Sequence, residues 1–369
     1  MKPDAIVVGG GVIGCSIALR LAKAGLKVTV LERGRIGREA SWAAAGMLAP
    51  QSETTGEEAI FDLSVRSRAL YRGFVDEVRS ISGIDPEYRG EGMLCVALND
   101  EDASSFAVWP SAQRRLGLSA ETLSADDTRR LESSVADSSL GGVFLPNDHQ
   151  LDSRKLMDSL AAAIGKLGVE VVEGNEVSEI VREGNKVTGV SSAGECLHAG
   201  AVIVATGCWS SRLLSTAELE IDVIPARGQM LAVDGGGLRM ERVLHSRRVY
   251  VVPRRDGRIL IGATLEYEGY SRKVTAGAMN RLLSAAIELA PAIAGCEVVE
   301  TWCGLRPDTP DHLPVIGPGP LENLFIATGH FRNGILLAPL TAEVITGMIV
   351  KGAIPDEIRP FGWERFTSA

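Results

Sequence analysis

Three glycines near the start of the chain have the spacing that binds the phosphates of a dinucleotide. Gly9, Gly11 and Gly14 follow the order G-x-G-x-x-G, and the acid Glu32 comes about 20 residues later. The first glycine permits a tight turn, the second lets a pyrophosphate approach the backbone, and the third lets a helix pack closely on a strand. Glu32 can accept hydrogen bonds from ribose hydroxyls and would repel the 2′-phosphate of NADP.

The elements predicted around these glycines have the order that the motif needs. An apolar strand over 5–8 leads into the glycines, a helix follows over 12–24, and a second strand over 27–31 ends at Glu32. The N–H groups at the start of that helix have no partner within it, so they can bind phosphate. The residues therefore predict a dinucleotide-binding unit, and they leave NAD and FAD both open.

The composition of the chain argues against several classes of protein. Its 369 residues are 45% hydrophobic and 23% charged, which is ordinary for a soluble globular protein. A net charge of −9 and the lack of a basic block make nucleic acid a poor partner. No apolar run approaches the roughly 18 residues of a membrane span, and the first strand leaves no room for a signal peptide. We therefore predict a cytoplasmic protein.

Cysteine and histidine are spread too widely to suggest a metal site. The six cysteines contain no C-x-x-C pair, and the five histidines contain no pair at helical spacing. They predict reduced thiols and no bound metal. His245 and His330 could act as general bases, although a purely structural histidine is the commoner outcome.

Patterns of parallel and antiparallel sheet occupy different parts of the chain. A nearly all-apolar strand at 201–205 predicts burial on both faces, as in a parallel sheet. Between 223 and 300, runs of β-branched and polar residues alternate with glycine turns and predict an antiparallel sheet. Helices are predicted at 57–80, at 102–116, at 154–167 with Ser153 as the N-cap, at 275–290 and in the C-terminal part of 323–350.

This order predicts an α/β protein, α+β overall, with two domains. A discontinuous Rossmann-like FAD-binding domain would comprise 1–83, 146–215 and 305–369. An antiparallel-sheet substrate domain would comprise 84–145 and 216–304. Domains that bind NAD are usually built from consecutive strand–helix–strand units. Because a long excursion follows the second strand here, FAD fits better than NAD.

Arg306 lies in the apolar segment CGLRPDTPDHLPVIG and could bind an anionic group. A guanidinium binds a carboxylate through two parallel hydrogen bonds, which would hold a substrate acid still. A surface-exposed structural arginine fits the same pattern, and the residues alone leave both interpretations open. Tyr250 and Met47 also allow a functional and a structural interpretation. Tyrosine is common in strands, and methionine often fills a core.

Segments along the whole chain resemble one family of flavoproteins. They are IVVGGGVIG with Glu32, SWAAAGMLAP, VYVVPRRDGRILIGATLE, WCGLRPDTPDHLPVIG and NLFIATGHFRNGILLAP. On these segments the chain is identified as a member of the D-amino-acid oxidase and sarcosine oxidase superfamily. It is most similar to the glycine oxidases of the thiamine-biosynthetic type. The segments AAAGML, GLRP and GHFRNGILLAP are specific in combination, which the glycine motif alone would not be.

The resemblance implies FAD and a set of residues around it. Val12 and Ile13 would lie at the pyrophosphate, Glu32 and Arg33 at the adenosine, and Val177 at the adenine. The other cofactor-binding residues that it implies are Gly9, Gly11 and Gly14, then Ala40, Ser41, Ala45, Gly46 and Met47 along the flavin, and His330, Phe331, Arg332, Asn333, Gly334, Ile335 and Leu336 at its pyrimidine edge.

The resemblance also implies four side chains at the substrate. Arg306 would bind the substrate carboxylate, and Arg332 would be a second arginine beside it. Tyr250 would be an aromatic lid residue with its hydroxyl near the carboxylate, and Met47 would form a wall of the pocket.

Two positions depart from the pattern of the family. Leu265 stands where a methionine is expected, and Cys303 replaces a small residue before Gly304. Sarcosine oxidases carry a flavin-linking cysteine near this region, but Cys303 is out of register with it. We therefore expect FAD to be bound non-covalently.

The resemblance implies an FAD-dependent amine or amino-acid oxidase. It would oxidise glycine, sarcosine, D-alanine or D-proline by hydride transfer from Cα to flavin N5. O2 would reoxidise the flavin and give H2O2, and the imine would hydrolyse to a 2-oxo acid and ammonia. The product could supply thiazole synthesis for thiamine, and the family suggests a homotetramer.

Two alternatives remain open at this point. The first is an FAD-dependent dehydrogenase for D-amino acids or D-hydroxyproline-type substrates that uses an acceptor other than oxygen. The second is a non-catalytic or RNA-modifying flavoprotein module, against which the acidic charge balance counts.

Overall fold

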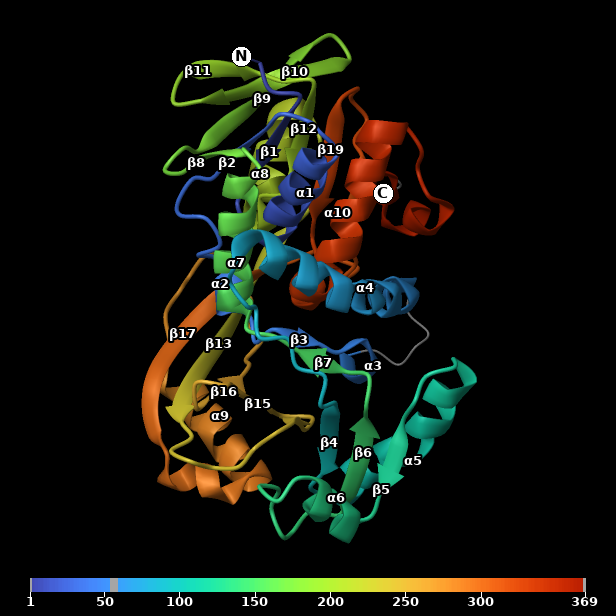
Figure 1. Ribbon diagram of the computed structural model, residues 1–369, viewed down its shortest axis with the longest axis vertical. Helices are drawn as coiled ribbons and strands as arrows, with labels where there is room; N and C mark the ends of the chain where they lie inside the picture. Colours follow the sequence, from blue (N-terminus) through green and yellow to red (C-terminus); the bar gives the residue numbers. More distant parts are fainter. Residues whose placement is uncertain (1, 54–58, 368–369) are drawn as a thin grey trace.

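The computed structural model describes residues 2–53 and 59–367, which form two lobes (Figure 1). We call them the first lobe, built on a six-stranded sheet, and the second lobe, built on an eight-stranded sheet. The strand order of the first sheet is β18 (Val315–Pro318), β19 (Leu324–Thr328), β12 (Ala201–Val204), β1 (Ala5–Val8), β2 (Val28–Leu31) and β8 (Glu170–Val172). All its neighbouring strands are parallel except the pair β18–β19.

Strand β1 shows why the first lobe has three layers. Its residues alternate between the two faces of the sheet, as the side chains of a strand must. Ala5 and Val7 belong to one hydrophobic cluster and Ile6 and Val8 to another. The first cluster packs against the helices α1 (Val12–Lys23), α4 (Ala59–Ser82), α7 (Ser153–Lys166) and α10 (Gly334–Lys351). The second packs against the small antiparallel sheet of β9 (Val177–Glu183), β10 (Lys186–Ser192) and β11 (Glu195–His198).

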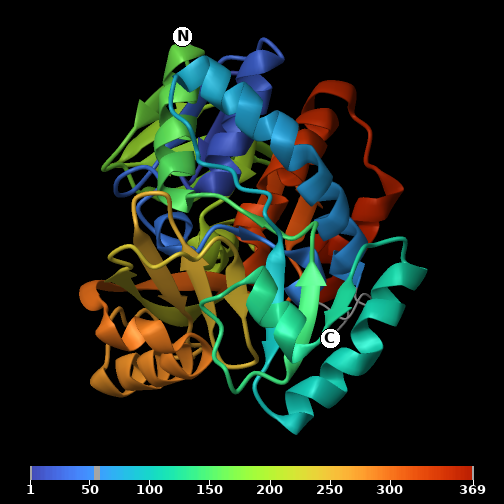
Figure 2. The ribbon, with the colours of Figure 1, turned by 60° about the horizontal axis from the view of Figure 1, so that its bottom comes forward.

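The eight-stranded sheet of the second lobe is almost entirely antiparallel. Its strand order is β17 (Glu297–Asp308), β13 (Ile224–Asp234), β16 (Arg258–Gly262), β15 (Tyr250–Pro253), β14 (Val243–His245), β4 (Met93–Ala97), β6 (Gly141–Leu145) and β5 (Glu121–Leu123). The pair β14–β4 is parallel, which the alternating pattern did not predict. The helix α9 (Ala276–Leu289) covers the face that points away from the first lobe (Figure 2).

The predicted α/β fold is confirmed, with small corrections at the helix ends. The residue that caps α7 is Asp152, whose carboxylate accepts hydrogen bonds from two backbone N–H groups, and Ser153 is the first helical residue. The predicted start of a helix at Glu57 lies outside the described residues, and α4 is described from Ala59. The helix predicted at 102–116 is α5 (Asp100–Arg115), with Asn99 as its N-cap.

The C-terminal helix corrects the prediction that no apolar run is long enough to span a membrane. By length and composition alone, Phe331–Lys351 could do so. In the structure 61% of its most apolar window is buried, and the helix packs beside α1 and α4 in the first lobe. Core helices of this kind have the same apolar composition.

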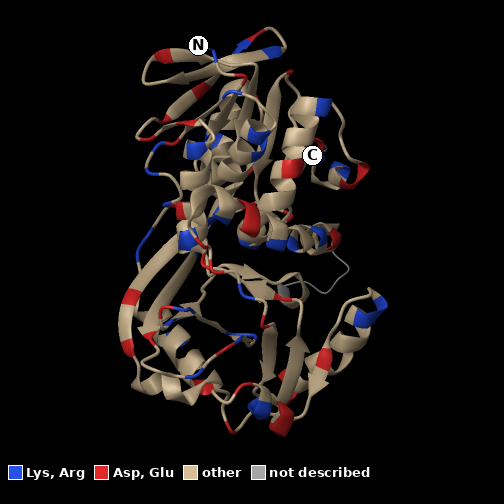
Figure 3. Ribbon diagram, in the orientation of Figure 1, with Lys and Arg blue, Asp and Glu red and all other residues tan. Residues whose placement is uncertain are grey.

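Acidic and basic residues are interspersed over both lobes (Figure 3).

Candidate flavin and substrate site

A cavity of about 350 Å³ lies between the two large sheets. The ends of β1, β2 and β12 open into it, together with the starts of α1 and α10. In parallel sheets, ligands bind outside the carboxyl ends of the strands, so this is the expected position for a dinucleotide. The opposite wall comes from β13, β15, β16 and β17 of the second lobe.

The glycine motif packs tightly against its neighbours in the first-lobe wall. A Cβ atom on Gly9 would lie 2.3 Å from the carbonyl oxygen of Ala205, and one on Gly14 would lie 1.9 Å from that of Gly9. Gly11 faces the cavity, where the Val12 N–H donates to Ser41 Oγ at 2.9 Å. A helix start with a polar hydroxyl beside it and room over the backbone fits a pyrophosphate.

The carboxylate of Glu32 is fixed by hydrogen bonds in the cavity wall. Only 7% of Glu32 is exposed, and its two carboxylate oxygens accept hydrogen bonds from the Gly10 and Gly34 N–H groups, each at 2.8 Å. These bonds fix the carboxylate at the end of β2. Val177 lies nearby in the cavity wall. This geometry fits the ribose and adenine of FAD.

Arg33 and Trp209 line the cavity beside Glu32, and Trp209 belongs to an aromatic stack. The Arg33 guanidinium lies 3.5 Å from the ring centroid of Trp209, which stacks on Tyr270 with centroids 5.8 Å apart. Glu39 pairs with Arg33 and with Arg272. Because Tyr270 and Arg272 belong to the segment after β16, this stack joins the two lobes. Sequence reasoning missed Trp209, although its place just after β12 was a usable signal.

Arg306 on β17 points beside a glycine that leaves room for it. Its Nη1 atom donates to the Thr264 carbonyl at 3.1 Å, and a Cβ on Gly228 would lie 2.3 Å from that same nitrogen. A second glycine, Gly262, makes room for Tyr250, since its Cβ would lie 2.7 Å from the phenol oxygen. Arg306 and Tyr250 therefore both reach the cavity because the neighbouring strands carry glycine there.

A chain of side-chain contacts begins near Arg306 at Asp308 and leads to Phe331 and Arg332, which line the cavity. Tyr267 donates to buried Asp308 at 2.6 Å, and the same carboxylate contacts His312 Nδ1 at 2.8 Å. The hydrogen bond to Asp308 raises the pKa of Tyr267. His312 stacks on Phe331, with ring centroids 5.1 Å apart. The exposed guanidinium of Arg332 lies 5.3 Å from the Phe331 centroid, at the edge of the cavity.

His330 is buried and its pKa is low, which makes it a weak general base. It is 2% exposed, its Nε2 atom contacts Thr341 Oγ1 at 3.1 Å, and burial lowers its pKa to about 3. Its ordinary pKa is about 6.5, so the unfolded chain binds a proton below pH 6.5 that the folded protein does not bind until about pH 3. The stability that neutral His330 permits is therefore complete above pH 6.5 and declines as the pH falls.

We expect the free energy of unfolding to fall by up to about 2 kcal/mol between pH 6.5 and pH 5 because of His330. In His330→Asn this part of the pH dependence should be absent. Urea unfolding of both proteins at pH 8, 6.5 and 5 measures the difference. His198→Asn, which alters an exposed histidine, should keep the wild-type slope. Equal slopes in wild type and His330→Asn would contradict the assignment.

The cavity brings together nearly all of the predicted site residues. Every one of them lines it except Gly14, which packs behind Gly9. Met47 and His245 lie in the wall. Among the described residues, Leu265 and Cys303 are not part of the lining: Leu265 is 40% exposed, and the Cys303 thiol donates to the Arg272 carbonyl at 3.0 Å. Sequence reasoning missed Gly228, Gly262 and Met230, which also line the cavity.

Fold and cavity together define a flavin-dependent oxidoreductase. The sequence pattern of the family described as FAD dependent oxidoreductase (DAO) matches residues 4–348, and the chain belongs to this family. Its cofactor is FAD, which the cavity residues fit from Glu32 to Arg306.

Within this family the chain is similar to glycine oxidases, as the sequence predicted. It is 34% identical to the glycine oxidase of Bacillus licheniformis, over 98% of this chain and 97% of that protein. The crystal structure of glycine oxidase from Geobacillus kaustophilus superimposes with a TM-score of 0.94 at 33% identity, covering 98% of each chain. The chain is also 36% identical to the bifunctional protein ThiO/ThiG of Synechocystis sp., over 98% of this chain. It spans about half of that relative, 54% of its length.

Proposed function

We propose that the protein oxidises glycine and other small amines or D-amino acids, using O2 as the electron acceptor. The observation that carries this proposal is the place of Arg306, a cation in the same cavity as the dinucleotide motif, with a glycine that makes room for it. The similarity to glycine oxidases over almost the full chain supports the same substrate class. Sarcosine, D-alanine and D-proline are the other substrates that we propose.

Different residues along the cavity would bind different parts of FAD. Gly9, Gly11 and Ser41 would hold the pyrophosphate and Glu32 the ribose. Ala45 to Met47 and the start of α10 would line the flavin. When bound, FAD would accept the two electrons from the substrate, and their transfer to O2 would give H2O2. The chain must then aim the substrate Cα at that acceptor and exclude water.

Arg306 and Tyr250 would fix the substrate by its carboxylate. The guanidinium can bind both carboxylate oxygens, and the phenol can donate a further hydrogen bond. Because burial lowers the pKa of His330 to about 3 and its Nε2 contacts Thr341, the amine proton would leave to solvent rather than to this histidine. The imine product would hydrolyse in water to a 2-oxo acid and ammonia.

A peroxide-coupled assay with glycine, sarcosine, D-alanine and D-proline tests the proposal. Purified protein should be yellow, and glycine should bleach the flavin absorbance without oxygen and yield peroxide in air. Bleaching without peroxide, together with reduction of an added quinone, would favour the dehydrogenase alternative instead. If none of the four amines bleaches the flavin, the proposal is wrong.

The protein would act in the cytoplasm as a homotetramer, and its product would supply thiazole synthesis for thiamine, in line with the ThiO/ThiG relatives. FAD would be bound non-covalently, since Cys303 does not line the described part of the cavity and donates its thiol to Arg272. The FAD-binding domain would comprise 1–83, 146–215 and 305–369, although β17 crosses its last boundary.

A further inference from the structure

The flavin-lining segment Ala43–Met47 is held from behind by a row of hydrogen-bond donors. The Ala43 carbonyl accepts from Trp302 Nε1 at 3.0 Å, and the Ala44 carbonyl from Ser153 Oγ at 2.6 Å. The Gly46 carbonyl accepts from the Leu151 N–H at 2.9 Å. The donor to the carbonyl between them, that of Ala45, is a buried arginine of the second lobe.

Arg254 follows β15 and reaches into the first lobe. It is 8% exposed, its Nη2 donates to the Ala45 carbonyl at 2.5 Å, and its Nη1 donates to the Leu151 carbonyl at 2.7 Å. One guanidinium therefore clamps the flavin-lining segment to the connection that leads into α7. The only acid within 4.0 Å of its guanidinium among the described ion pairs is Asp152, which also caps α7.

These bonds determine which way the backbone of the segment faces. In a trans peptide the carbonyl of one residue and the N–H of the next point in opposite directions. The carbonyls of Ala44, Ala45 and Gly46 all point to donors behind the segment. The N–H groups of Ala45, Gly46 and Met47 must therefore point the other way, and these three residues line the cavity.

Glycine at position 46 is part of the same arrangement. Gly46 has φ of +72°, and a Cβ there would lie 2.0 Å from the Leu151 carbonyl oxygen, the second acceptor of Arg254. The segment and the Leu151 backbone thus touch without a side chain between them. A shift of the guanidinium would release both backbones at once.

We propose that Arg254 is a positioning residue for the flavin: by holding the Ala45 and Leu151 carbonyls, it turns the N–H groups of Ala45, Gly46 and Met47 toward the cofactor. Donors that are aimed in advance at an electron acceptor stabilise the negative charge that develops there. This inference rests on the proposed function only in placing FAD against this segment. Because Tyr250 begins the short strand β15 and Arg254 directly follows it, one element would then help to place both substrate and flavin.

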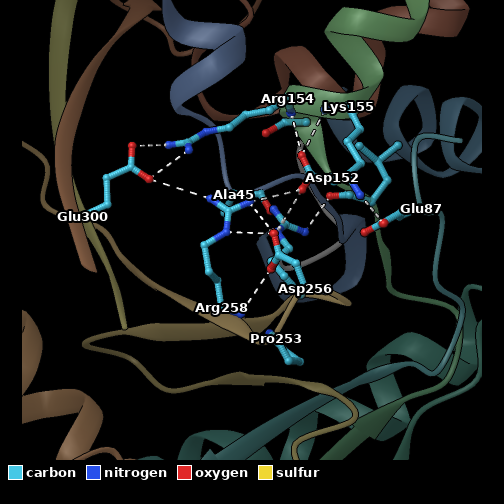
Figure 4. A network of polar contacts seen from close by, with 12 residues as sticks. Ala45, Glu87, Asp152, Arg154, Lys155, Pro253, Asp256, Arg258 and Glu300 are labelled. Atoms are coloured by element: carbon cyan, nitrogen blue, oxygen red, sulfur yellow. Dashed lines mark hydrogen bonds and ion pairs between the residues drawn. The ribbon is translucent and has the colours of Figure 1, made fainter. Parts of the chain in front are cut away.

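The surrounding ion pairs supply a matched control (Figure 4). Arg258 pairs with Asp256 at 2.8 Å and lies 3.9 Å from Asp152 and 3.7 Å from Glu300. It belongs to the same charged network as Arg254, and the partners of its guanidinium are the carboxylates of Asp152, Asp256 and Glu300. Arg258→Met therefore removes a neighbouring positive charge of the same type and leaves the segment's recorded donors in place.

The test compares Arg254→Met, Arg254→Lys and Arg258→Met with wild type as holoenzymes. The measurements are the FAD dissociation constant, the visible flavin spectrum and the reduction potential of bound FAD. Arg254→Met should weaken FAD binding about tenfold or more, because the Ala45 and Leu151 carbonyls lose their donor and Asp152 loses a nearby positive charge. Its flavin spectrum should shift and its potential should fall. Arg254→Lys should recover part of each change, since an ammonium group can satisfy one carbonyl but lacks the fork.

Arg258→Met should keep the wild-type spectrum and potential, with FAD affinity unchanged within about twofold. A folded Arg254→Met protein with wild-type affinity, spectrum and potential would overturn the proposal, as would equal changes in Arg258→Met. If Arg254→Met does not fold, the same criteria apply to Arg254→Lys. None of these measurements uses a substrate, so a failure of the glycine assay in wild type remains a separate result.

Discussion

Arg306→Ala should lower kcat/KM for glycine by about 2–5 kcal/mol of transition-state binding, that is about 30-fold to several thousand-fold, while FAD stays bound. The reason is that the substrate carboxylate would lose its bidentate partner in a cavity where water is largely displaced. Stopped-flow reduction of the flavin at varied glycine concentration measures the effect. The kcat/KM of Arg306→Lys should lie between those of wild type and Arg306→Ala, because a lysine binds a carboxylate as a point charge.

Arg332→Ala is the matched control for this result. Arg332 is exposed at the edge of the cavity, so its removal should cost less than that of Arg306. If Arg306→Ala keeps the wild-type rate and KM, Arg306 does not bind the substrate. If Arg332→Ala shows the larger loss, the two arginines have exchanged roles.

Gly228→Ala should damage the same step without removing any functional group. The added methyl would lie 2.3 Å from Arg306 Nη1, which is far inside van der Waals contact, and the flexible guanidinium must move. We expect KM for glycine to rise by about tenfold, in line with the 1–3 kcal/mol that overpacking usually costs. The fold and the bound FAD should remain, because the clash is with the end of a side chain and not with backbone.

A double-mutant cycle separates this effect from general damage. In an Arg306→Ala background, Gly228→Ala should cause no further loss, since the displaced group is already absent. Gly165→Ala, at a helix position with no atom within 4 Å of the new methyl, should leave the kinetics unchanged. Additive losses in the double variant would show that Gly228 acts by another route.

Local patterns predicted the cofactor end of the site well. The glycines, Glu32 and the apolar strand at 201–205 follow rules that act within a few residues, and the structure brings their elements together in one sheet. The resemblance added the positions of Arg306 and Tyr250. Ser153 was predicted as the N-cap of α7, but the N-cap is Asp152. Both residue types are good N-caps, and only the hydrogen bonds decide between them.

Contacts between distant segments were beyond the reach of the sequence. The stack of Trp209 on Tyr270 joins residues of different lobes, and the bond from Arg254 to Ala45 joins residues 209 positions apart. Neither has a periodic signal. The apolar face of α10 had a signal, but the same composition serves a core and a membrane, so only packing could assign it.

The strand order of the first lobe has a consequence for how the protein is made. The glycine motif leaves the ribosome before β2, β12 and β19, yet β1 lies between β2 and β12, and the sheet continues to β19, which ends at Thr328. The dinucleotide site also needs the start of α10 at Gly334. The dinucleotide site is therefore complete only after the chain up to the start of α10 has emerged. Closing contacts over such sequence distances is slow, so we expect the first lobe to assemble only after α10 has been made.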